Sequence, residues 1–143
     1  MADPLGPPSP HDGAADPGPG PSGGVYEWYV RGVELLGAGD AAAASQLLAR
    51  AAAAEPGSRS IREALARSLF DAGRYAEARE EFRALVELDP ADDYALFGVG
   101  MAAGRLGDHR EAVEHLALAV AMRPDRADYA RALRRARAQL SRP

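Results

Sequence analysis

The 143-residue chain contains no cysteine, no threonine, no lysine and no asparagine, and it has a single isoleucine. Without cysteine it has no disulfides, no thiolate metal ligands and no cysteine nucleophile. The scarcity of threonine and isoleucine, which favour strands, argues against a β-rich fold. Arginine is the only cationic side chain besides histidine, and alanine, glycine and proline are abundant. This bias is typical of a bacterial genome of high GC content.

Long hydrophobic runs are missing as well. No apolar stretch approaches the roughly 20 residues that a membrane-spanning helix needs. The first residues carry neither a basic side chain nor an apolar segment, unlike a secretory signal. We therefore expect a cytoplasmic protein without a membrane segment.

Alanine dominates what is present. Hydrophobic residues make up 47% of the chain, and 32 residues are alanine. The large apolar side chains are too few for a thick globular core. Alanine is the best helix former and takes little room. The composition therefore predicts an all-α fold built from thin layers of closely packed helices.

Residues 1–24 differ from the rest, since they hold seven prolines and six glycines. Such a segment cannot bury enough apolar surface to offset the entropy of ordering it. We expect a disordered tail over 1–24. The prolines between Pro7 and Pro10 are also compatible with a polyproline II ligand. No basic residue flanks them, which favours a solubilising tail.

An internal period of 34 residues begins after the tail. It relates Gly39, Gly73 and Gly107, then Ala44, Ala78 and Ala112, and then Pro56, Pro90 and Pro124. Three triplets that share one period predict three structural repeats. The corresponding frames are 25–58, 59–92 and 93–126.

The content of these frames resembles the tetratricopeptide repeat (TPR) family. The first frame has Trp28-x2-Arg31-Gly32-x2-Leu35, the second has Leu65-Ala66-x2-Leu69, and the third has Leu96-x2-Val99-Gly100-x2-Ala103. Each frame continues with Ala-x3-Leu or Ala-x3-Phe and has its proline two residues before its end. The resemblance implies a right-handed superhelix of three helix-turn-helix repeats with a C-terminal capping helix.

Local signals agree with two helices in each frame. Gly39, Gly73 and Gly107 stand where a left-handed residue ends a helix. Asp40 and Asp108 are expected to cap the second helices of their frames. Asp89 and Pro90 fit the N-cap and first position of the helix that follows.

Small residues predict where the paired helices cross. Gly32, Ala66 and Gly100 are expected to face Ala44, Ala78 and Ala112. After the last frame, 127–141 predicts a capping helix with a single apolar stripe. Such a helix covers the end of a repeat array, because each repeat buries its apolar face only on a neighbour.

Nothing in the sequence supports catalysis, a metal site or a cofactor. His109 and His115 are six residues apart, so they do not share one helix face as paired metal ligands do. Adjacent acids such as Glu80 and Glu81 indicate a solvated surface. We predict a protein that is not an enzyme.

In the TPR pattern, positions 2, 5, 9 and 12 of each first helix line a concave groove. The resemblance implies a peptide-binding groove that includes Tyr26, Tyr29, Val33, Glu63, Arg67, Phe70, Tyr94, Phe97, Met101, Arg131 and Arg135. Aromatic side chains and arginine are typical binding hot spots. We therefore predict a non-catalytic protein–protein interaction module that binds a peptide or partner segment with an acidic element.

Two alternatives bear on the partner. The family's carboxylate-clamp pattern uses lysine and asparagine, which this chain lacks, so the resemblance does not transfer that pattern. Residues 123–143 carry seven arginines and two acids, but the whole chain has a net charge of −4, which disfavours nucleic acid.

The alternative function is a self-associating TPR scaffold, a homodimer in which another copy covers the groove or the convex face.

Overall fold

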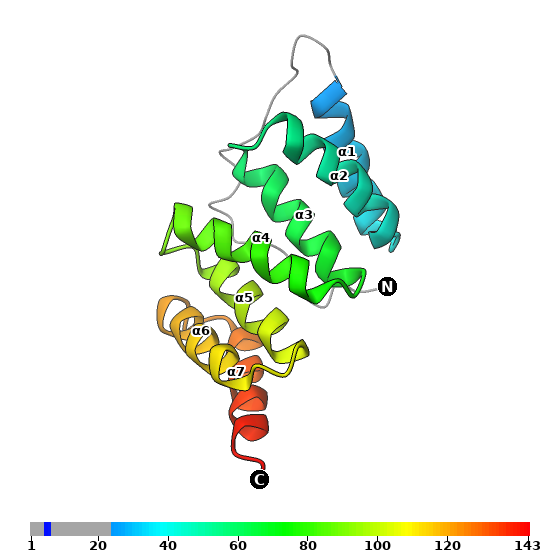
Figure 1. Cartoon of the computed structure of the whole chain (residues 1–143). Coiled ribbons are helices and arrows are strands. Elements are labelled where there is room, and N and C mark those ends of the chain that lie inside the picture. Colours follow the sequence, from blue (N-terminus) through cyan, green and yellow to red (C-terminus); the bar gives the residue numbers. More distant parts are fainter. Residues whose placement is uncertain (1–4, 7–23) are drawn as a thin grey trace. The chain divides into compact units, whose positions relative to one another are not determined.

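A computed structural model describes residues 5–6 and 24–143 (Figure 1). Its described residues form seven α-helices and no strand. In chain order these are α1 (Gly24–Gly37), α2 (Ala41–Ala54), α3 (Arg59–Asp71), α4 (Tyr75–Leu88), α5 (Asp93–Arg105), α6 (His109–Met122) and α7 (Ala127–Leu140). The fold is therefore all-α, as predicted, and the helix starts repeat the period of the sequence.

Short polar side chains begin most of these helices. Asp40, Ser58, Asp92 and Asp108 each accept a hydrogen bond from a backbone N–H of the first turn. The prediction that Asp89 caps α5 is wrong. Its carboxylate instead accepts from Ala91 N–H within the preceding turn, and Asp92 takes the capping position.

Glycine ends the first helix of each pair. Gly39, Gly73 and Gly107 have φ values of 88°, 82° and 84°, in the left-handed region that favours glycine. The chain can therefore turn at once into α2, α4 and α6. This confirms the prediction from the 34-residue spacing.

The chain divides into two compact units, 1–74 and 75–143. In the N-terminal unit, α1 packs on α2 and α2 packs on α3. Gly32 lies against Leu48, so close that a Cβ at Gly32 would meet Leu48 Cγ at 2.6 Å. Trp28 on α1 lies under the guanidinium of Arg50 on α2, at 4.3 Å from the ring centroid. A small residue at the crossing thus lets the two helices approach closely.

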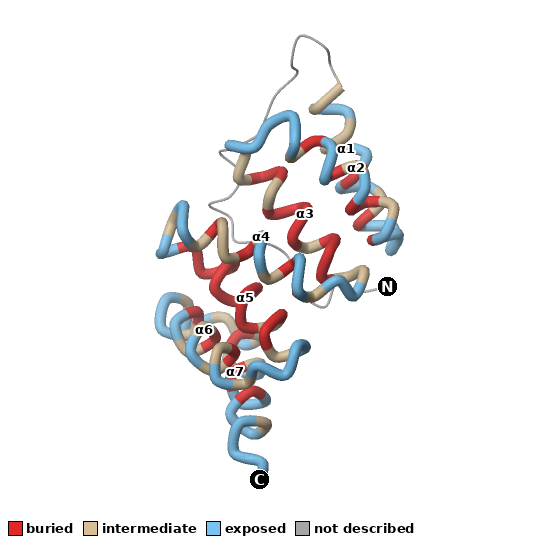
Figure 2. The backbone as a smooth tube through the Cα atoms, viewed as in Figure 1, coloured by how far each residue is buried: buried red, intermediate tan, exposed pale blue. Residues whose placement is uncertain are grey.

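In the C-terminal unit, α5 packs against α4 and α6, and α7 packs on α6 and on α5. Residues 92–100 are all buried, which makes α5 the centre of this unit (Figure 2). A row of aromatic rings crosses it: Phe82 lies edge-on to Tyr94, Tyr94 lies beside Phe97, and Phe97 stacks on Tyr129. This row joins α4, α5 and α7.

Ion pairs also join α4 to α6. Arg79 and Arg83 both donate hydrogen bonds to the half-buried carboxylate of Glu111. The bond with Glu111 raises the pKa of the Arg83 guanidinium above its ordinary value. A single acid on α6 is thus held by two arginines of α4.

The small residues predicted at the helix crossings are confirmed as buried. Ala44, Ala78 and Ala112 are each 1% exposed or less. The contact that Gly100 makes is more specific than expected. A Cβ there would meet Leu116 Cγ at 2.6 Å before it reached Ala112 O at 3.2 Å. Gly100 therefore makes room for a leucine side chain rather than only for alanine.

The predicted disordered tail lies outside the described residues except for Leu5, Gly6 and Gly24. Leu5 departs from the expectation, because its side chain is 1% exposed. Gly6 follows with a φ of 72°, again in the left-handed region. Leu5 is therefore buried, which is not expected of a residue in a disordered segment.

Within the described part of the chain, no helix is both long enough and apolar enough to span a membrane.

Candidate functional site

The structure distributes the predicted groove residues over very different environments. Tyr26, Val33, Arg131 and Arg135 are exposed, and Tyr29, Arg67 and Met101 are half-buried. The other four are buried: Glu63, Phe70, Tyr94 and Phe97. The list therefore mixes surface residues with core residues.

Tyr94 and Phe97 belong to the core, with 0% and 2% exposure. The expectation that their rings line an open groove is therefore wrong. The Phe97 ring stacks on Tyr129 with a centroid separation of 4.6 Å, and Tyr94 lies between Phe97 and Phe82. These rings hold α4, α5 and α7 together, and so their surfaces are already used within the chain.

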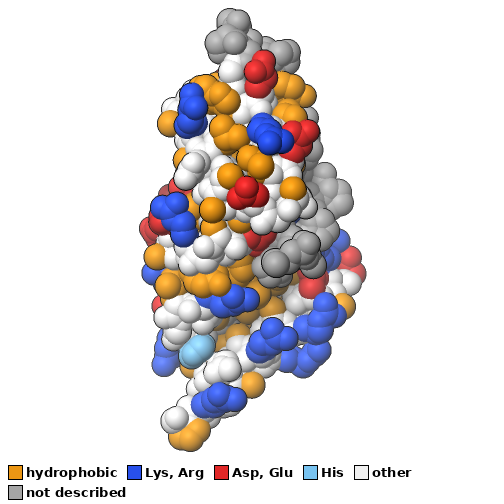
Figure 3. Space-filling model, turned by 90° about the vertical axis from the view of Figure 1, so that its right-hand side faces the viewer, with side chains coloured by type: hydrophobic (Ala, Val, Ile, Leu, Met, Phe, Trp, Pro, Cys, Tyr) orange, Lys and Arg blue, Asp and Glu red, His pale blue; other side chains and the backbone are white. Residues whose placement is uncertain are grey.

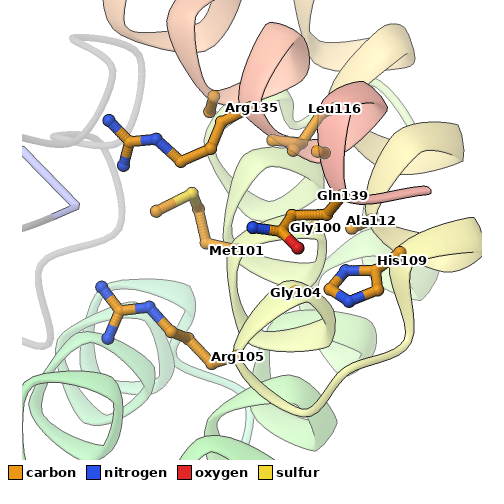
Figure 4. A pocket seen from close by; sticks show the side chains of 11 residues that line it. Gly100, Met101, Gly104, Arg105, His109, Ala112, Leu116, Arg135 and Gln139 are labelled. Carbon is orange, nitrogen blue, oxygen red and sulfur yellow. The ribbon is translucent and has the colours of Figure 1, made fainter. Parts of the chain in front are cut away.

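The C-terminal unit contains an open cavity of about 310 Å³ between α5, α6 and α7 (Figure 4). Its lining consists of Gly100, Met101, Gly104, Arg105, His109, Ala112, Leu116, Ala132, Arg135, Ala136 and Gln139. This volume is near the lower end of the range for ligand pockets, about 300–1,000 Å³. The cavity is therefore the candidate functional site.

Small residues create this cavity. Gly104 on α5 has no side chain to fill it, and a Cβ at Gly104 would only reach an ordinary contact with Ala112 Cβ, at 3.8 Å. On α7, Ala132 and Ala136 stand one turn apart and line the opposite wall. The same preference for alanine and glycine that lets helices pack closely thus leaves a hollow near the C-terminal end of α5.

Two arginines border the cavity on one side. Figure 4 shows the guanidinium groups of Arg105 and Arg135 pointing out on the same side, with the Met101 side chain between them. Arg105 Nη1 donates a hydrogen bond of 2.8 Å to Tyr75 Oη, and its guanidinium lies 5.4 Å from the Tyr75 ring centroid. Arg105 is therefore held in place from α4, whereas Arg135 projects from α7.

His109 and Gln139 lie on the other side of the cavity from the two guanidinium groups (Figure 4). Both can donate or accept hydrogen bonds. The walls between the two polar sides are formed by glycine, alanine, leucine and methionine. The site thus combines an apolar interior with polar groups at its edges, as binding pockets do.

The charge around the cavity is positive. Among the described residues that line it, none is acidic. The acids near the start of α7 are engaged elsewhere: Asp125 pairs with Arg123, and Asp128 accepts two hydrogen bonds from Arg126. Arg135 forms no ion pair with any described carboxylate. The arrangement therefore favours an anionic group at the cavity.

The pKa values of these acids follow from the same pairs. The hydrogen bonds from Arg123 lower the pKa of Asp125. Partial burial alone would raise the pKa of Asp128, but the hydrogen bonds and charge of Arg126 outweigh it, so this pKa is also lowered. Both acids remain ionised and paired at neutral pH.

In the side view, arginine side chains are more frequent on the lower half of the visible face (Figure 3). Residues 123–143, which include α7, carry seven arginines. Within the described part of the chain, no group of histidine, aspartate and glutamate side chains is arranged to hold a metal ion.

Of the predicted groove residues, Met101 and Arg135 are brought together at the cavity. Arg131 lies on α7 but does not line it. Sequence reasoning missed Arg105, His109 and Gln139, which lie outside the groove positions of the family pattern. A signal was present in Gly100 and Gly104, which leave one side of α5 without side chains over a full turn.

Comparison with known proteins supports the fold. Tetratricopeptide repeat profiles match residues 35–99 and 94–126. Among curated proteins, none matches the chain in sequence. Among solved structures, the chain is similar to the Sgt2 TPR domain from Aspergillus fumigatus, with a TM-score of 0.74 and 17% identity over 85% of this chain and 81% of that one.

Two further similar structures contain peptides. The first TPR domain of Spaghetti (RPAP3) bound to the HSP90 peptide SRMEEVD gives a TM-score of 0.77 at 18% identity, over 83% of this chain and 94% of that one. The second TPR domain of human RPAP3 in complex with the HSP70 peptide SGPTIEEVD gives 0.75 at 20% identity, over 82% and 98%. The matches to tetratricopeptide repeat profiles, which agree with the helix pattern, show that the chain belongs to the tetratricopeptide repeat family.

Proposed function

We propose that this chain is a non-catalytic protein-interaction module that binds an acidic segment of a partner protein at the cavity between α5, α6 and α7. The observation that carries the proposal is the pairing of an open apolar cavity with Arg105 and Arg135 on one edge and no acidic side chain in its lining. Such a site suits a peptide that is apolar at one position and negatively charged at another.

Arginine is well suited to this task. Its planar guanidinium can donate two parallel hydrogen bonds to one carboxylate, which lysine cannot. The absence of lysine and asparagine therefore does not prevent acidic recognition, although it requires a different set of side chains from the family's carboxylate clamp. Here Arg105 and Arg135 would supply the charge.

The similar structures provide supporting chemistry. The peptides SRMEEVD and SGPTIEEVD each contain two consecutive glutamates and end in aspartate. They are thus acidic peptides that also carry apolar side chains. Because they are bound by TPR domains of similar fold, they are suitable probes for this chain. The setting that we propose is the cytoplasm of a bacterium, in keeping with the coding bias of the composition.

The test is fluorescence polarisation with labelled SRMEEVD and with labelled SRMQQVN, in which the three acidic side chains are replaced by the corresponding amides. We expect the full chain to bind the acidic peptide at least about tenfold more tightly, since hydrogen bonds to charged groups contribute more than neutral ones. The preference should shrink as salt is added, because exposed charges are screened. Equal affinity for the two peptides, or binding of neither, would contradict the proposal.

A pair of charge reversals on α7 locates the site. Arg135→Glu should weaken binding of SRMEEVD by at least about tenfold, because it places a like charge at the cavity. Arg137→Glu makes the same change in net charge at an exposed position that does not line the cavity. If both variants lose the same affinity, only the overall charge matters and the cavity is not the site.

A further inference from the structure

The dimensions of the cavity limit what it can hold. A volume of about 310 Å³ is small for a drug-sized molecule, and the cavity is open to the surface. Gly104 leaves room at the α5 wall, because nothing lies closer to its Cβ position than Ala112 Cβ at 3.8 Å. The space therefore suits one protruding side chain rather than a folded or bulky ligand.

The interior of the cavity favours an apolar side chain. Ala112 and Leu116 of α6 and Ala132 and Ala136 of α7 supply methyl and methylene groups to its walls. Met101 stands at the edge beside the two guanidinium groups (Figure 4). Its flexible thioether can adjust to side chains of different shape. The polar side chains of the lining, His109, Gln139 and the two arginines, lie at the edges and not in this apolar interior.

The arginines define which apolar residue can bind. Arg105 is fixed by its hydrogen bond and ring contact with Tyr75, and Arg135 is free of described acids. Both point to the same side of the cavity (Figure 4). An entering side chain therefore has positive charge beside its backbone. A carboxylate one or two residues away along an extended peptide falls within reach of that charge.

We propose that the cavity is a specificity pocket: it holds one bulky apolar side chain of the partner, while Arg105 and Arg135 bind a carboxylate next to that side chain in sequence. This inference rests on the proposed function and adds a size-selective site to it. Gly104 is the residue that determines the size, because any larger residue there projects into the space that the partner's side chain needs.

The experiment fills the cavity from within the chain. Gly104→Leu places a leucine in it, and Ala132→Leu does so from the opposite wall. The control is Ala138→Leu, an exposed position on α7 that does not line the cavity. Circular dichroism and thermal melting of each full-length variant establish that the helices persist.

Each variant is titrated with SRMEEVD and with SRGEEGD, in which both apolar residues are replaced by glycine while the acids remain. We expect Gly104→Leu and Ala132→Leu to weaken binding of SRMEEVD by at least tenfold and to change binding of SRGEEGD by less than threefold. Ala138→Leu should affect neither. Loss of affinity would then depend on the apolar side chains of the peptide.

Other outcomes separate the two proposals. Filling the cavity could weaken the binding of both peptides equally, or of neither, while the wild type still prefers acidic peptides. That result would overturn the specificity pocket and leave the proposed function standing. If the wild type binds neither SRMEEVD nor SRGEEGD, acidic-segment binding itself fails and the pocket fails with it. Two cavity-filling variants guard against a single folding failure.

Discussion

Tyr129 Oη donates a hydrogen bond of 2.7 Å to Asp93 Oδ2, which ties the first turn of α7 to the first residue of α5. Both residues are buried, so the bond lies in a region that excludes water. A carboxylate that is buried this deeply needs its donors. The bond also fixes the Tyr129 ring, on which Phe97 stacks.

Removing this hydroxyl should destabilise the protein. Tyr129→Phe leaves the ring in place and deprives the Asp93 carboxylate of one donor, which costs about 1–3 kcal/mol of unfolding free energy. Chemical denaturation measures the loss. Tyr75→Phe is the control, because its hydroxyl lies in an exposed contact with Arg105. Equal effects of the two changes would show that the bond to Asp93 contributes nothing specific.

Phe97→Ala should act on the fold before it acts on binding. The ring is 2% exposed and contacts both Tyr94 and Tyr129. Its removal from the core should cost about 3–5 kcal/mol. Tyr26→Ala, at an exposed ring on α1, should change the unfolding free energy by less than about 1 kcal/mol. Denaturation curves of the two variants compare them, and a stable Phe97→Ala protein would mean that this ring is not part of the core.

Two glycines on α5 should respond in opposite ways to the same substitution. Gly100→Ala brings a methyl group against Leu116 and should destabilise by about 1–3 kcal/mol. Gly104→Ala meets only open space and an ordinary contact, so the better helix former should stabilise by up to about 1 kcal/mol. Thermal melting decides the sign. A shift of the same sign in both variants would contradict the helix spacing described here.

Leu5 gives a prediction for the N-terminal segment. Because its side chain is 1% exposed, Leu5→Ala should lower the unfolding free energy by about 1–3 kcal/mol. The sequence alone predicts no effect there, since a disordered segment has no buried contacts to lose. Leu140→Ala, at an exposed leucine near the end of α7, is the matched control. If the two variants unfold alike, the enclosure of Leu5 does not contribute to stability.

The pair between Arg126 and Asp128 predicts a dependence on pH. The pKa of Asp128 is lower in the folded chain than its ordinary value of 3.8, so the folded state binds this proton less readily than the unfolded state. The associated stability is present above that ordinary value and is lost as the pH falls through the lowered pKa. Asp128→Asn should therefore show a smaller loss of stability on acidification than the wild type.

Denaturation at a series of pH values between neutral and strongly acidic checks this difference. Arg126→Gln removes the other partner of the ion pair and should reduce the loss of stability at acidic pH in the same way. The double variant should behave like either single variant, because all three lack the same interaction. If the variants lose as much unfolding free energy on acidification as the wild type does, this pair does not contribute to the dependence on pH.

The helices could be predicted from the sequence because the signals for them are local. The period of 34, the left-handed glycines such as Gly39 and the caps such as Asp40 each depend on a few neighbouring residues. The predicted cap of α5, Asp89, lies three residues before the observed cap, Asp92, because Asp89, Asp92 and Asp93 all suit the start of a helix. Only the backbone geometry distinguishes among them.

The candidate site was harder to predict from the sequence, for a physical reason. Helical periodicity indicates which residues share a face, but α5 is buried nearly all round over residues 92–100, so no face of it is free there. The sequence therefore predicts the correct helix for Tyr94 and Phe97 but the wrong environment. The cavity exists because Gly104 and Ala132 have little or no side chain to fill it. Its walls come from three helices, so its presence depends on how all three pack together.

The stacking of Trp28 under Arg50 has a practical consequence. Trp28 is the single tryptophan of the chain, so tryptophan fluorescence monitors the contact between α1 and α2 in the N-terminal unit. Circular dichroism reports on every helix. In a repeat protein each layer is stabilised mainly by its neighbours, so melting can begin at one end. Tryptophan emission and ellipticity recorded together therefore follow the fraying of the first helix pair separately from the collapse of the whole array.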